Sequence, residues 1–149
     1  MQKLTDNIAL LLITAWVGAL WATGGLVVQV LFNNLDHVVA GTLAGKMFTA
    51  LSYFGIVAAF ILMMHRVAAF GLMALKQSYF WILIAMLALI LAGQFGIQPI
   101  LGKLKAMALP AEVMQSVFAD RFRAWHGIAS VAYLIECLLG ATLVLKARP

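Results

Sequence analysis

Charged residues are scarce in this sequence, and their scarcity indicates its class. Only 10% of the 149 residues are Asp, Glu, Lys or Arg, whereas 65% are hydrophobic. A soluble domain carries about 25% charged residues. The sequence therefore predicts an integral membrane protein, and at this length residues 1–149 are expected to form a single domain.

Cysteine, histidine and acidic residues are also few, which removes several kinds of site. The one cysteine, Cys137, cannot form an internal disulfide and is expected to pack as a small hydrophobic residue. The sequence contains no CxxC, HxxxH or Met-x-x-Met spacing. It also has no visible phosphate-binding loop, Ser-His-Asp arrangement or paired-carboxylate site, so nothing in it indicates an enzyme.

Long apolar runs are what the sequence does have. Crossing a bilayer takes roughly 20 apolar residues in a helix, and four runs reach that length. The first run follows Lys3 and could be taken for a signal peptide. The apolar core of a cleaved signal peptide has about 7–15 residues. This run is longer, so we expect it to remain as a span. The sequence thus predicts an all-α, antiparallel four-helix transmembrane bundle with both termini on one side. Its spans are expected at about 8–32, 43–65, 79–101 and 120–145.

Basic residues lie at the ends of these spans, where they suit lipid headgroups and not nucleic acid. The two sides carry five each, so the charge rule alone does not orient the chain. If Lys46 and Arg123 serve a polar site instead, fewer anchoring charges remain on their side of the membrane. The positive charges then favour cytoplasmic termini in a bacterial inner membrane. The terminal side has Lys3, Arg66, Lys76, Lys146 and Arg148, and the other side has Lys46, Lys103, Lys105, Arg121 and Arg123.

Polar side chains gather in the half of the bundle away from the termini. Polar groups in lipid need partners, so their convergence predicts either a pocket or a set of interhelical hydrogen bonds. The pocket would open to the non-cytoplasmic side and bind or translocate a small polar or anionic ligand. Its expected ligand-binding residues are Lys46, Tyr53, Gln94, Gln98, Arg123, His126 and Ser130.

Span four carries one stripe of polar and small residues at helical spacing. Arg123, His126, Ser130 and Tyr133 follow each other on this stripe, and Glu136 lies at its margin near mid-bilayer. Because desolvation disfavours a charged carboxyl, we expect Glu136 to be neutral. It would then hydrogen-bond to another helix or serve as a proton-relay group.

Two other functions stay open on the sequence. Stripes of small residues on spans one and two could dock a membrane-protein partner or a second copy, which would make the chain an accessory subunit. Copper or haem handling is the second, because imidazole and thioether groups suit copper. Its metal candidates are His126 and His37, and the sequence identifies no cofactor.

Four segments carry a family resemblance: AWVGALWATGG, DHVVAGTLAGKMFTALSYFG, LAGQFGIQPILGKLKAMALP and DRFRAWHGIASVAYLIECLLG. Together they resemble an uncharacterised bacterial membrane family, domain of unknown function 4149, which is related to eukaryotic transmembrane protein 205. The resemblance implies a four-span inner-membrane protein and no settled activity. More distantly, WVGALW is similar to copper-resistance and haem-related four-span proteins. An acid at the position of Glu136 is not part of the family pattern.

Overall fold

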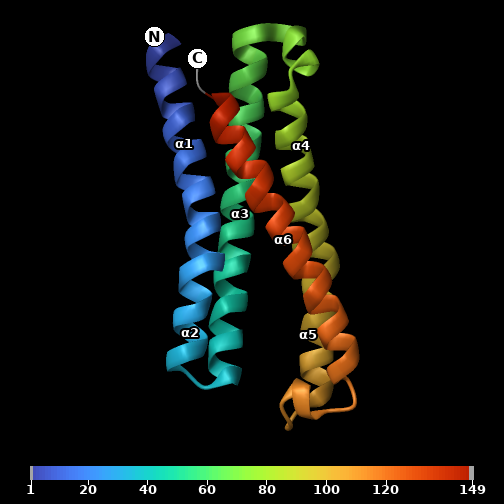
Figure 1. The fold of residues 1–149 in the computed structure, drawn as a ribbon. Coiled ribbons are helices and arrows are strands. Elements are labelled where there is room, and N and C mark those ends of the chain that lie inside the picture. The colour runs from blue at the N-terminus through green and yellow to red at the C-terminus, as the bar shows by residue number, and fades with distance from the viewer. Residues whose placement is uncertain (1, 148–149) are drawn as a thin grey trace.

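The computed structural model describes residues 2–147, which form long helices joined by short connections (Figure 1). Each of the four spans expected from the sequence lies within one helical rod that is long and apolar enough to cross a membrane. Arg148, counted above among the basic residues of the terminal side, lies outside the described residues. The four rods cover Lys3–Asn34, His37–Lys76, Ser78–Ala108 and Ala119–Ala147.

Two of the rods contain a π-helical turn, which the sequence analysis did not predict. A π turn takes in one more residue than an α turn and is frequent at functional sites. The second of these turns leads directly into α5, whose second residue is Pro99. The first rod consists of α1 (Gln2–Ala22), the π-helical η1 (Thr23–Val27) and α2 (Val28–Asn34), and the third of α4 (Ser78–Leu91), the π-helical η3 (Ala92–Ile97) and α5 (Gln98–Ala108).

The other two rods are bounded by residues with clear local roles. The side chain of Asp36 accepts a hydrogen bond from the backbone N–H of Val38 at 3.1 Å and thereby caps the start of α3. Gly71 ends α3 with φ 56°, a backbone conformation that favours glycine. The elements here are α3 (His37–Phe70), the 3-10 turns η2 (Gly71–Lys76) and η4 (Val113–Gln115), and α6 (Ala119–Ala147).

The helices pack most tightly in the half of the bundle that holds the two chain ends. There α1 contacts α3 and α6, and α4 contacts the same two helices, so the four surround one core. Trp16 is fully buried in this core, and a Cβ on Gly55 of α3 would lie 2.9 Å from the Trp16 indole nitrogen. The close approach of α1 to α3 therefore requires glycine at position 55. The other large side chains buried in full are Ile13, Leu20, Leu62, Leu83, Met86 and Leu143.

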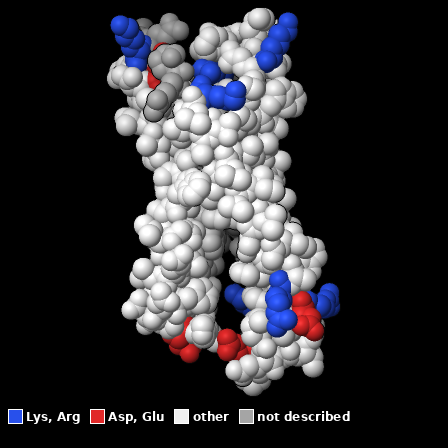
Figure 2. Space-filling model, in the orientation of Figure 1, with Lys and Arg blue, Asp and Glu red and all other residues white. Residues whose placement is uncertain are grey.

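The opposite half of the bundle separates into two pairs of helices. There α2 packs on α3, and α5 packs on α6. Figure 2 shows the molecule hollowed between these pairs, with charged side chains gathered at both ends of an otherwise uncharged surface. Four of the polar residues singled out from the sequence, Gln94, Gln98, His126 and Ser130, line one cavity between the helices.

Candidate functional site

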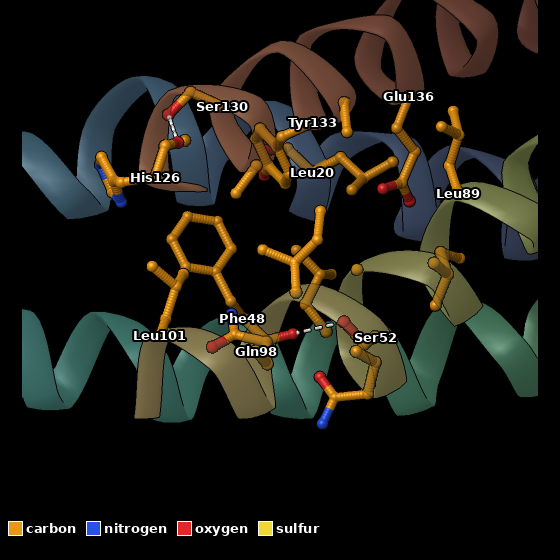
Figure 3. Close-up of a pocket in the computed structure, with 18 of the residues that line it drawn as sticks. Leu20, Phe48, Ser52, Leu89, Gln98, Leu101, His126, Ser130, Tyr133 and Glu136 are labelled. Carbon is orange, nitrogen blue, oxygen red and sulfur yellow. Dashed lines mark hydrogen bonds between the residues drawn. The ribbon is translucent and has the colours of Figure 1, made fainter. Parts of the chain in front are cut away.

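A cavity of about 350 Å³ lies between α3, the η3–α5 segment and α6, with Leu20 and Gly24 of the first rod on its far wall (Figure 3). We call it the central cavity. Most of its wall is aliphatic or aromatic. Its polar lining residues are Ser52 on α3, Gln94 and Gln98 on η3 and α5, and His126, Ser130, Tyr133 and Glu136 on α6.

The hydroxyl groups in the central cavity all donate to backbone carbonyls. Ser52 Oγ donates to the carbonyl of Phe48 at 2.8 Å, and Ser130 Oγ donates to the carbonyl of His126 at 2.9 Å. Tyr133 donates its hydroxyl hydrogen to the carbonyl of Leu20 on α1. Each of these hydroxyl groups has only one hydrogen, so its oxygen can take part in further hydrogen bonds only as an acceptor.

Gly24 and Tyr133 make the tightest contact beside the central cavity. A Cβ on Gly24 would lie 2.5 Å from Cε1 of the Tyr133 ring, so only glycine leaves room for the ring at this position. The ring is held on its other side by Phe48, whose centroid is 5.1 Å away in an edge-to-face arrangement. Gly24 belongs to η1, while Gln94 belongs to η3, so both π turns contribute to the cavity wall.

Two of the lining groups lack the partners that buried polar groups usually have. Gln94 Oε1 is buried, and no hydrogen-bond donor reaches it within residues 2–147. Glu136 is 8% exposed, and its carboxyl points into the cavity (Figure 3). No Lys or Arg from the described part of the chain lines this cavity. A buried acceptor and a buried acid thus share a space without a fixed positive charge.

Lys46 lies in a separate, open groove of about 380 Å³, which we call the lysine groove. Its second lysine is Lys105, and Gln98 borders both spaces. Gly41 and Gly45 form part of its floor on α3. Lys105 Nζ lies 5.7 Å from the centre of the Phe122 ring. Lys46, which was expected near a ligand, therefore lies in a separate groove and does not line the central cavity.

The structure places Tyr53 and Arg123 outside the central cavity. Tyr53 follows Ser52 by one residue and is therefore turned about 100° around α3, away from the central cavity. The exposed fraction of Tyr53 is 52%. Arg123 pairs with Asp120 one turn earlier on α6, at 3.3 Å, and is not among the cavity residues. Both residues were expected to face the site because helical spacing defines only a broad stripe, several residues wide. Spacing does not determine which side chains of such a stripe point inward.

The three histidines lie far apart in the fold. His126 lines the central cavity and stacks on Phe122, whereas His37 lies against Phe32 at the turn between α2 and α3. His65 pairs with Asp6 at 3.1 Å in the terminal half. Within residues 2–147, no three His, Cys, Asp or Glu side chains are grouped so that they could hold a metal ion. His126 and His37 are therefore not joined in one site.

Ser52 and Tyr133 both line the central cavity, although neither is among the ligand-binding residues expected from the sequence. Tyr133 was assigned to the inward stripe of span four, at i+7 from His126. Ser52 lies among the small residues of span two, whose spacing also suits helix packing. Both residues lie at the helical spacing of an inward face. That spacing is the same for residues that line a cavity and for residues that contact another helix.

Four long apolar helices around a shared core define a multi-pass α-helical membrane protein, whose outer surface contacts the lipid bilayer. A family model described as a domain of unknown function (DUF4149) matches residues 11–110. The chain belongs to this family, as the motifs in its sequence indicated. No curated protein and no solved structure matches it.

Proposed function

We propose that this protein binds a small molecule with an apolar body and hydrogen-bonding groups in the central cavity. The observation that supports this most is the cavity itself, a space of about 350 Å³ with apolar walls and polar side chains converging from α3, α5 and α6. Sites for small molecules typically have volumes of about 300–1,000 Å³ and a few polar groups on an apolar wall. Polar side chains used only to join helices would pair with each other and leave no such space.

The geometry favours binding over passage through the bundle. On the terminal side of the central cavity, Trp16, Leu83 and Leu143 are fully buried and fill the space between the helices. A ligand can approach from the opposite half, where the helix pairs separate (Figure 2). Translocation would require the packed half to open. We propose that the open half faces the non-cytoplasmic side of a bacterial inner membrane.

The lysine groove is the better place for an anion. Lys46 and Lys105 border it near the end of their helices, where lysine side chains attract anionic lipid headgroups. Arg123 is engaged with Asp120 on its own helix. We therefore assign these basic residues to the membrane interface. The ligand of the central cavity is then polar or amphiphilic and not anionic, which narrows the class expected from the sequence.

A cavity-filling variant tests this proposal. Ala132 lines the central cavity, and Ala132→Phe should fill it, whereas Ala124→Phe adds the same ring to an exposed position of α6. Binding of para-fluorobenzyl alcohol to the protein in nanodiscs would be followed by fluorine NMR. We expect saturable binding in the wild type and in Ala124→Phe and its loss in Ala132→Phe. Equal signals in all three proteins would contradict the proposal.

An accessory-subunit function is the second candidate, and one observation favours it. The small-residue face of the first rod points outward: a Cβ on Gly18 of α1 or Gly25 of η1 would meet nothing within 4 Å. Helices approach each other closely in membranes at such faces. If a partner or second copy docks there, Gly18→Leu should abolish a crosslinked complex in native membranes. An unchanged complex, or none in the wild type, would remove this candidate.

A further inference from the structure

We infer that the ligand of the central cavity is a lipophilic amine, which takes the proton of Glu136 and is held as an ammonium beside the resulting carboxylate. This inference rests on the proposed function and specifies its ligand. The neutral amine enters, the carboxyl proton moves to the amine nitrogen, and the ion pair that forms has no net charge. No further reactant is needed.

The balance of donors and acceptors in the cavity supports a ligand that donates hydrogen bonds. The hydroxyls of Ser52, Ser130 and Tyr133 already donate to backbone carbonyls. Gln94 Oε1 is buried without a donor from the described residues. A buried acceptor without a donor destabilises the structure around it. An ammonium carries up to three N–H donors and can satisfy Gln94 and the carboxylate of Glu136 together.

The surroundings of Glu136 do not suit an anionic ligand, and no Lys or Arg among the described lining residues acts as a counter-ion for its carboxylate. Glu136 is buried, and no Lys or Arg among the described residues lines the cavity with it. The other titratable lining residues are His126 and Tyr133, both on α6. Lining residues of α1, α3, α4 and α5 carry no titratable group. A cation on the ligand is therefore what would pair with the carboxylate.

The walls of the cavity favour an organic cation over a metal ion. Phe48 and Tyr133 both line it, and ammonium groups are attracted to the faces of aromatic rings. Hard cations such as Ca²⁺ take about 6–8 oxygen ligands, whereas Glu136 is the one acid that residues 2–147 contribute to the lining. The aliphatic remainder of the wall would contact the apolar body of the amine.

Three matched ring compounds test the inference: para-fluorobenzylamine, para-fluorobenzyl alcohol and para-fluorobenzoate, each measured by fluorine NMR in nanodiscs. In the wild type we expect the amine to bind about tenfold more tightly than the alcohol, because charge-assisted hydrogen bonds are the stronger ones. The benzoate should not bind. In Glu136→Gln the ratio of amine to alcohol affinity should fall to about one, and in Ala124→Phe it should stay at the wild-type value.

The outcomes separate this inference from the proposed function. If the alcohol binds in the wild type but not in Ala132→Phe, and the amine binds no better, the cavity is a site and the amine inference is wrong. An amine preference that survives Glu136→Gln would also overturn it. If none of the three compounds distinguishes the wild type from Ala132→Phe, the proposed function itself fails. Should Glu136→Gln not fold, Gln94→Leu provides the second test, because removal of this acceptor should lower the same ratio.

Discussion

The contact between Gly24 and Tyr133 leads to a specific prediction about stability. In Gly24→Ala the new Cβ would lie 2.5 Å from the Tyr133 ring, and the ring would have to move. Movement of the ring would weaken the hydrogen bond from Tyr133 to the carbonyl of Leu20. We therefore expect Gly24→Ala to destabilise the protein, although alanine is the better helix former.

The size of the effect follows from three contributions. Overpacking costs about 1–3 kcal/mol, and the weakened hydrogen bond costs about 1 kcal/mol. The helix propensity of alanine returns at most about 1 kcal/mol. The net loss in the free energy of unfolding is then about 1–3 kcal/mol. For a chain of this length, a loss of about 2 kcal/mol lowers Tm by roughly 4–8 °C.

Thermal unfolding in one detergent would measure this loss, with Gly25→Ala as the matched control. A Cβ on Gly25 meets nothing within 4 Å, so this variant should have a Tm equal to or slightly above that of the wild type. Combining Gly24→Ala with Tyr133→Leu should remove most of the added cost, because the ring atoms that clash are absent. Equal Tm values for Gly24→Ala and Gly25→Ala would refute the reasoning.

Three further predictions concern charged residues. Glu136→Gln should change the free energy of unfolding by less than about 1 kcal/mol, since we expect the carboxyl to be neutral in the empty protein; a loss of about 3–5 kcal/mol would instead indicate a broken buried ion pair. Arg123→Lys should leave Tm unchanged within error, because an exposed pair with Asp120 contributes only about 0–1 kcal/mol, and a large drop would contradict its position outside the cavity. A cysteine at Lys105, in a Cys137→Ala background, should react with an impermeant thiol reagent in intact cells, and labelling only after lysis would reverse the proposed orientation.

The fold was the most predictable part of the structure. Apolar length alone locates the four spans, because a bilayer requires about 20 apolar residues per crossing whatever their order. Asp36 is a local helix-start signal, and in the structure its side chain caps α3. The π turns η1 and η3 were not predictable, because their residues carry no pattern that separates a π turn from an α turn.

The candidate site was predictable in part. Gln94, Gln98, His126 and Ser130 were chosen because they are polar at helical spacing, and all line the central cavity. Arg123 shares that spacing but is long enough to turn toward Asp120 and the exterior. Spacing assigns a residue to one side of a helix. The direction of a long charged side chain also depends on which oppositely charged neighbour lies within its reach.

Non-protein density between the helices is the most direct test of the central cavity as a ligand site. The protein would be purified in nanodiscs with para-fluorobenzylamine, and its structure determined experimentally beside that of Ala132→Phe. We predict density in the wild type between Gln94 and Glu136, with the amine nitrogen toward the carboxyl, and none in the variant. A cavity that is closed, or that is empty at saturating amine, would contradict the account.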